Sequence, residues 1–251
     1  KALKISNKWL NPVAGSGPTP DPYNPLGLPP NTVRVRTSNG NPPAKWSDTT
    51  YETATLVSGT TDVYDVYKSG DSFRGLLYNG TNIIEVLGAN TTGITNMRDM
   101  FHDCDHITTV PLFDTTSVTD MYQMFVDCEY LVSVPLFDTS NVTNMGSMFR
   151  ICRRLTAVPL FNTSKVTTMQ NMFDNCQTLT SVPLFDTSNV TNMDMTFTYC
   201  KQLINIPLFN TSKVTDMNSM FYGCTNVQSG ALALYQQAST QSTPPSSHSQ
   251  T

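Results

Sequence analysis

The sequence predicts an α/β solenoid, in which short coils of chain stack into one elongated body. Three rows of residues recur every 24 positions and support this fold class: Cys104, Cys128, Cys152, Cys176, Cys200 and Cys224; Phe101, Phe125, Phe149, Phe173, Phe197 and Phe221; Met97, Met121, Met145, Met169, Met193 and Met217. A fixed period of this length is typical of repeat proteins, in which each repeat stacks on the next. Such an array favours an extended binding surface over a catalytic pocket.

Three segments flank or precede the array. Residues 1–31 combine a short strand or peg at 1–10 with a Pro-rich stretch at 11–31, which predicts an extended, semi-rigid linker. Residues 32–72 form a small β-rich cap, because VRVRT (33–37), YETATLV (51–57) and DVYDVY (62–67) are rich in Val, Thr and Tyr. Residues 229–251 comprise a short closing helix at 231–238 and a Ser/Thr/Pro-rich tail.

The array itself is predicted to run from residue 73 to residue 228. Its first repeats are atypical, with Phe73, Leu76 and Leu77 at the later Met, Met and Phe positions and Gly80 at the Cys position. Terminal repeats often depart from the pattern because they have a neighbour on one side only.

Each coil is expected to alternate a short helix with a short parallel strand. Met121, Met124, Phe125 and Cys128 stand at i, i+3, i+4 and i+7, the spacing of one apolar helix face, and Thr119 precedes them at the N-cap position. The strand that follows is expected to point Leu131, Val134 and Leu136 inward, with Pro135 facing outward between the last two.

A second aromatic row follows the strand: Phe113, Phe137, Phe161, Phe185 and Phe209. This row is either buried or exposed as an aromatic stripe. We expect burial, because a line of exposed Phe side chains would be sticky.

The even number of cysteines allows disulfides, but the stacked coils argue against them. Equivalent side chains in successive coils point in parallel into the core and do not face each other. We therefore expect a ladder of buried free thiols that act as small hydrophobic groups. The redox compartment stays open.

The turn after each strand alternates with a period of 48 residues. Asp138 to Asn141 and Asp186 to Asn189 read DTSN, whereas Asn162 to Lys165 and Asn210 to Lys213 read NTSK. Stacked Asp residues would repel each other, so interleaved Asn and Lys spread the charge. A calcium stripe is the alternative, but the glycine-rich calcium repeat is absent.

Candidate chemistry is sparse. His102 and His106 stand at i and i+4 beside Asp103, Cys104 and Asp105, a spacing that can hold a metal on a helix, although we favour a solvated first coil. We expect no metal, no cofactor and no enzyme activity. A formal net charge of −4 argues against a nucleic-acid surface, and no apolar run approaches the roughly 18 residues of a membrane span.

Residues that differ between coils define a candidate partner-binding face. Its members are Tyr122, Tyr130, Arg150, Arg153, Arg154, Tyr199 and Tyr222, and an acidic spot lies earlier at Asp103, Asp105, Asp127 and Glu129. Tyr and Arg are favoured at recognition hot spots. Surface drift under weak constraint is the alternative explanation.

The repeat unit FDTSNVTNMxxMFxxCxxLxxVPL, at 137–160 and 185–208, resembles the BspA-like leucine-rich repeats over about 73–228. Members of that family usually carry Asp or a similar residue at the Pro position. The resemblance implies a leucine-rich-repeat solenoid, a surface module without catalytic residues, and a protein or glycan on a cell surface as partner. Similar arrays with VPLFDTS repeats and a GALALYQQAS-type closing helix occur in virion proteins of gut bacteriophages.

Three functions remain open. The first is a bacteriophage virion component on the virion surface: a head-fibre, decoration or tail-associated protein that contacts other virion proteins through its N-terminal segment. Lys1 and the absence of a visible signal peptide or lipobox favour it. The second is a bacterial cell-surface or secreted adhesin, and the third is an accessory domain of an enzyme. An oligomer is possible.

Overall fold

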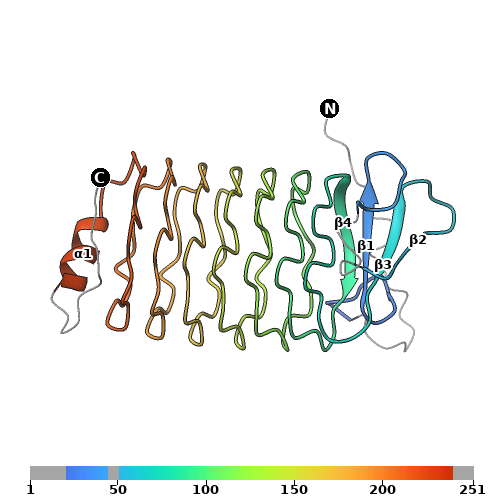
Figure 1. The fold of residues 1–251 in the computed structure, drawn as a ribbon, viewed down its shortest axis with the longest axis horizontal. Coiled ribbons are helices and arrows are strands. Elements are labelled where there is room, and N and C mark those ends of the chain that lie inside the picture. Colours follow the sequence, from blue (N-terminus) through green and yellow to red (C-terminus); the bar gives the residue numbers. More distant parts are fainter. Residues whose placement is uncertain (1–20, 45–50, 240–251) are drawn as a thin grey trace, which may run out of the picture.

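The computed structural model describes residues 21–44 and 51–239 as a stack of windings between a small sheet and a terminal helix. Figure 1 shows the windings side by side along one straight axis, with the sheet at one end and helix α1 at the other. The predicted peg at 1–10, the linker up to residue 20 and the tail from residue 240 lie outside the described residues.

The sheet has four antiparallel strands in the order β2-β3-β1-β4: β1 (Thr32–Thr37), β2 (Thr53–Leu56), β3 (Val63–Tyr67) and β4 (Ile83–Asn90). The first three are the strands predicted at 33–37, 51–57 and 62–67. The alternating pattern of β1 buries Val33 and Val35. β4 belongs to the predicted array but pairs with β1, so it joins the sheet to the stack.

Residues 21–31 do not run extended as expected of a linker. The backbone N–H of Asn24 donates to Asp21 and that of Gly27 to Asn24, at 3.1 and 3.0 Å, which closes two turns. The Asn24 side chain then accepts from Leu28 N–H at 2.8 Å, and Leu28 is buried. This local Asn hydrogen bond competes with an extended chain.

Parallel bridges join each winding to the next. They link Ser72, Asn96, Asp120, Asn144, Thr168, Asn192 and Asp216 in turn, at steps of 24 residues. A threonine one residue earlier adds a bond at every step, as where Thr143 N–H donates to Thr119 O at 2.9 Å. Equivalent residues therefore stack in register along the axis.

The core consists of those stacked rows. Phe101, Phe125, Phe149, Phe173 and Phe197 are fully buried, with neighbouring ring centroids 5.3 to 5.7 Å apart and interplanar angles of 9° or less. The second aromatic row is also buried, which confirms that prediction: Phe113, Phe137, Phe161, Phe185 and Phe209. Each ring in these rows meets the ring one winding away in the offset or parallel contact that aromatic groups favour.

The six cysteines are free, as expected, and those from Cys104 to Cys200 are buried. Each thiol donates to the carbonyl oxygen of a residue 27 positions earlier, such as Cys152 to Phe125 at 3.1 Å. Burial raises the pKa of Cys152 well above its usual value and that of the partly exposed Cys224 to about 11. The thiols are therefore neutral hydrogen-bond donors within the core.

The predicted short helix in each coil is wrong. Gln123 and Asp127 have left-handed φ angles of 56° and 57°, and the other windings repeat such residues. Their N–H groups donate to the next winding, to Gly146 and Arg150 at 3.0 and 2.9 Å, while Met124 N–H closes a tight turn onto Met121. The left-handed residues direct alternate N–H groups outward, so the segment exchanges helical bonds for bonds between windings, and Thr119 caps no helix.

The expected strand is also reduced, and Leu136 does not point inward. Phe137 N–H donates to Pro135 O at 3.0 Å, which closes a three-residue turn around Leu136. The turn directs Phe137 into the core and leaves Leu136 60% exposed. The same bond recurs between Phe161 and Pro159 and in the two following windings. Proline fits the first position of this turn because its missing N–H is not needed there.

Helix α1 (Ala231–Ser239), predicted at 231–238, closes the far end of the core. Its Leu234, Tyr235 and Ala238 are buried, and the Tyr235 ring meets Phe221 edge-on at 5.8 Å. Gln237 Nε2 donates to Phe209 O at 2.8 Å. The last exposed row of the stack is thereby covered.

Candidate functional site

The stack has two long faces that differ in chemistry. The turn face is formed by residues 97–107, 121–131, 145–155, 169–179, 193–203 and 217–227. The flat face is formed by residues 108–112, 132–136, 156–160, 180–184 and 204–208. All the predicted site residues lie on the turn face.

The first two windings of the turn face carry an acidic hollow of about 260 Å³. Its lining includes two stacked pairs of carboxylates, Asp103 with Asp127 and Asp105 with Glu129. Burial raises the pKa of Asp127, and the negative charge of Asp103 raises it further. The hollow therefore concentrates negative charge that its own surroundings only partly neutralise.

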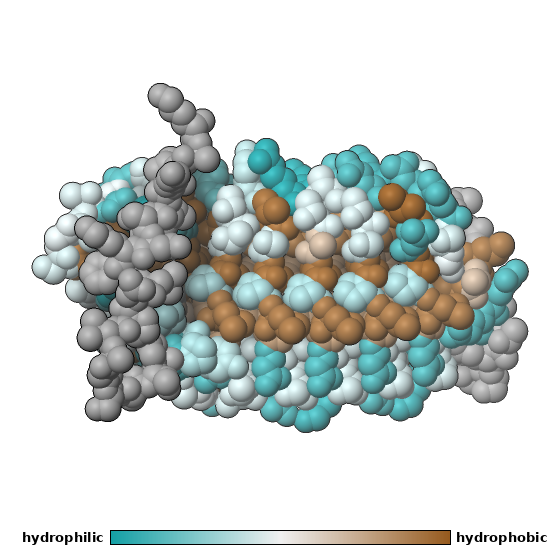
Figure 2. Space-filling view, turned by 180° about the vertical axis from the view of Figure 1, so that it is seen from behind, coloured by the Kyte–Doolittle hydropathy of each residue, from teal (hydrophilic) through white to brown (hydrophobic). Residues whose placement is uncertain are grey.

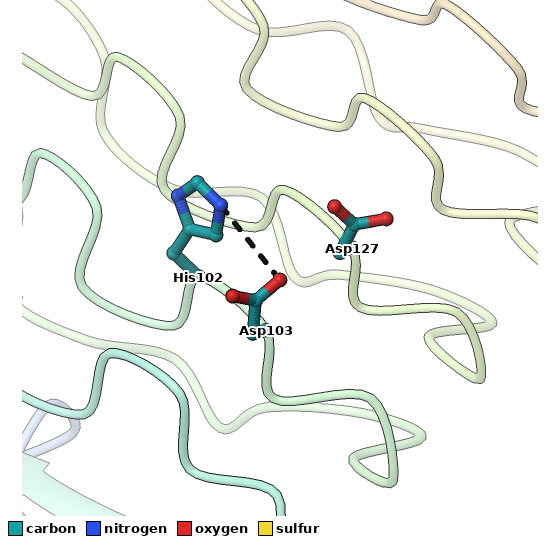
Figure 3. A group of neighbouring side chains, drawn as sticks. All are labelled: His102, Asp103 and Asp127. Carbon is teal, nitrogen blue, oxygen red and sulfur yellow. Dashed lines mark ion pairs between the residues drawn. The ribbon is translucent and has the colours of Figure 1, made fainter. Parts of the chain in front are cut away.

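One edge of this hollow brings a histidine to the carboxylates. Figure 3 shows His102 and Asp103 on one winding and Asp127 on the next, with one possible ligand atom from each within 4.8 Å of the others. His102 Nε2 lies 3.8 Å from Asp103 Oδ1, and its Nδ1 lies 3.6 Å from Asp99 Oδ1. The Tyr78 ring packs against the imidazole at 4.4 Å between centroids.

One nitrogen and two carboxylate oxygens form a ligand set that a divalent cation can use, while a protonated His102 would form ion pairs with the same carboxylates. The sequence pointed to His106 as the second ligand, and the structure does not support that pairing. His106 lies apart, half exposed, with its ring 5.9 Å from Tyr130. The 24-residue relation of Asp103 to Asp127 was the signal for the right neighbour, since equivalent residues stack.

The structure brings four of the predicted site residues together on adjacent windings. Arg153 forms an ion pair with Glu129 at 2.6 Å, and the Arg154 guanidinium lies 4.3 Å above the Tyr130 ring. Arg150 reaches the opposite way, to Asp174 at 3.1 Å. We call this group, Tyr130 with Arg150, Arg153 and Arg154, the Arg–Tyr cluster.

The other predicted tyrosines stand apart from that cluster. Tyr122 lies under Arg98, whose guanidinium is 4.2 Å from its ring. Tyr199 and Tyr222 meet edge-on at 5.3 Å near the far end of the stack. The predicted face is thus three separate groups on one side of the molecule.

Two glycines that the sequence reasoning missed make room for these rings. A Cβ atom on Gly146 would lie 3.1 Å from the Tyr122 ring, and one on Gly223 would lie 2.4 Å from the Tyr199 ring. Each ring therefore covers a glycine of the next winding. Glycine at a position that carries a side chain in the other windings was the available signal.

The turns with the 48-residue alternation lie outside both faces. Lys165 Nζ donates to Asn141 Oδ1 at 2.7 Å, and Lys213 contacts Asn189 in the same way. Asp138 accepts from Ser140 N–H at 2.9 Å, which lowers the pKa of its carboxyl. The alternation therefore places cations between the acidic turns and bonds them to the preceding winding.

A second hollow, of about 300 Å³, lies between the last winding and α1. Its lining includes Phe221, Cys224, Gly230 and Tyr235. Over the described residues, no helix is both long and apolar enough to cross a membrane.

Comparison with known proteins identifies the family. The model of the family described as "Mycoplasma protein of unknown function, DUF285" matches residues 72–179 and 153–242, more than half of the chain. No curated protein is significantly similar in sequence.

Among solved structures, a leucine-rich repeat protein from Eubacterium ventriosum is similar, with 19% sequence identity and a TM-score of 0.47. The match covers 65% of this chain and 45% of that one, so this chain spans less than half of that protein's length. The repeats that form the stack, together with α1, are the part that the family model recognises, and the chain belongs to the DUF285 family.

Proposed function

We propose that this chain is a non-enzymatic recognition module of the BspA-like leucine-rich-repeat type, which binds a protein or glycan on a cell surface through its turn face. The resemblance of its VPLFDTS repeats to virion proteins supports a bacteriophage virion as the carrier. The cell surface of a bacterium is the alternative carrier, and the BspA-like resemblance favours it equally at the level of the repeat.

The observation that carries the proposal is the contrast between constant and variable positions of the repeat. The Cys position never changes from Cys104 to Cys224, because every winding needs the same buried group. The turn-face position one residue later reads Asp105, Glu129, Arg153, Gln177, Lys201 and Thr225. Variation on one exposed face of a constant scaffold is how repeat proteins build distinct binding surfaces.

The Arg–Tyr cluster is the part of this face best suited to anchor a partner. Arg153 and Arg154 are exposed, and each already lies against a group of the preceding winding, which restricts its side chain before binding. Arg and Tyr in such a setting form hot spots, because little conformational entropy is lost on contact. The nearby acidic hollow would repel acidic partners, so the pair of patches also sets orientation.

The test compares two charge-matched double variants. Arg153→Ser/Arg154→Ser removes two cations from the Arg–Tyr cluster, whereas Lys165→Ser/Lys213→Ser removes two cations outside the turn face. Arg150 is left in place because its loss would leave Asp174 without its cation. Labelled protein is titrated onto intact bacterial cells and onto immobilised mucin.

We expect saturable binding that weakens at least about tenfold in the arginine variant and is unchanged in the lysine variant, with equal Tm values for both. Equal affinity of the two variants, or no saturable binding to either surface, would refute the proposal. The neighbouring genes distinguish the carriers: capsid and portal genes indicate a virion, whereas an upstream signal sequence with a lipobox indicates a cell surface.

A further inference from the structure

The flat face contains no charged residue. Its five segments read TTVPL, VSVPL, TAVPL, TSVPL and INIPL, without Asp, Glu, Lys, Arg or His, although charged residues make up 14% of the chain. The centre of a protein interface is depleted of charge in this way, whereas a solvated face is not. The turn face, with its Arg–Tyr cluster and acidic hollow, has the opposite composition.

A row of exposed leucines crosses this face. Leu136, Leu160, Leu184 and Leu208 are 60%, 60%, 61% and 56% exposed, and Leu112 begins the row partly buried. Figure 2 shows an unbroken hydrophobic band along the length of the stack on this side. Monomeric proteins rarely expose an apolar patch of this continuity.

The fold does not require leucine at these positions. The three-residue turn between Pro159 and Phe161 is closed by backbone atoms and directs the central side chain to solvent. A polar residue there would satisfy the turn equally well. The repeated leucine therefore serves contact with something outside the winding.

We propose that the occupant of the flat face is a second copy of this chain, packed antiparallel about a two-fold axis that passes near Leu160. Leu160 is the central member of the five-leucine row, so a two-fold axis there pairs Leu112 with Leu208 of the other copy. The row is straight and evenly spaced, so an identical row shifted by half a winding fills the spaces between its side chains. A two-fold contact uses the same patch twice, and here no like charges are brought together.

The available area suits such a dimer. Each leucine that is about 60% exposed leaves on the order of 100 Å² of apolar surface. The leucine row with the adjacent prolines and the exposed Val132 and Ile204 offers roughly 600 to 800 Å² per copy, close to the ~800 Å² that each partner buries in a stable interface.

The test uses the mass in solution and a matched exposed leucine. Sedimentation velocity under reducing conditions, from about 1 to 100 μM, should give twice the 27.7 kDa chain mass for the wild-type protein. Leu160→Lys/Leu184→Lys should raise the dimer dissociation constant at least about tenfold, because the interface would bury unpaired charges. Leu232→Lys is the control, since Leu232 is 61% exposed but lies on α1.

The arrangement is tested by cross-linking. Leu160→Cys should form a disulfide-linked dimer on mild oxidation, because the axis places the two Leu160 residues side by side, while the wild-type thiols serve as the background. A monomeric wild-type protein at 100 μM, or a dimer that survives Leu160→Lys/Leu184→Lys, would overturn the proposal. If the lysine variant loses its circular dichroism melt, Leu160→Ser/Leu184→Ser replaces it. Failure of Leu160→Cys to cross-link would overturn the antiparallel packing.

Discussion

The stacked phenylalanine row predicts a graded cost of truncation along the stack. Phe149 is fully buried, and its ring lies between Phe125 and Phe173, each with its centroid 5.7 Å away. Phe221 occupies the same position in the last winding, where it is only partly buried and stacks on Phe197 alone. An interior repeat has two neighbours, whereas a terminal repeat has one.

Phe149→Ala is therefore expected to cost about 3 to 5 kcal/mol of unfolding free energy, the usual range for a fully buried Phe, because a cavity opens between two windings. Phe221→Ala should cost about 2 kcal/mol, since it loses one stacked ring and less buried surface. Phe149→Leu should cost less than about 1.5 kcal/mol, because it keeps an apolar group of similar volume.

The assay is urea unfolding followed by circular dichroism, with the slope of free energy against urea compared between variants. An unchanged slope shows that the same surface unfolds in each case. The reasoning would be refuted if Phe221→Ala cost as much as Phe149→Ala, because stacking from both sides would then contribute nothing.

Three other predictions follow from the same structure. Deletion of residues 145–168 removes one whole winding and should leave a cooperative melt, whereas deletion of 145–156 breaks every register; equal melting behaviour would argue against in-register stacking. The folded state raises the pKa of Asp127 and so binds the extra proton, which means that stability falls as pH rises from the unfolded pKa through the folded one; Asp127→Asn should gain up to about 1 kcal/mol at pH 7. Asp138→Asn should destabilise at pH 7, because the fold lowers that pKa and favours the carboxylate, and stability curves against pH would expose a failure of either sign. A thiol reagent should label Cys224 first in the native protein and all six cysteines in denaturant, and rapid native labelling of the others would contradict their burial.

Much of the interior could be predicted from the sequence. The buried rows that contain Cys152 and Phe149, the free thiols, the burial of Phe161, the strands before the stack and the closing helix were all predicted from spacing and composition. Equivalent residues in a regular repeat share one environment, so a pattern seen six times is read with little ambiguity.

The candidate site was only partly accessible in this way. The exposed Arg and Tyr residues could be listed, but which of them touch depended on the direction of side chains from different windings. Arg154 reaches back to Tyr130, while Arg150 reaches forward to Asp174. His102 meets Asp127 and not His106 for the same reason.

The sequence by itself determined which side chains are inward and that they recur in register. Tertiary structure decided how the backbone achieves this pattern. An inward set at i, i+3, i+4 and i+7 fits a helix and also fits a winding with left-handed residues such as Gln123. The carbonyl groups of the next winding select the second form, because they accept N–H groups that a helix would keep for itself, and the proline turns then leave Leu136 and its equivalents facing solvent.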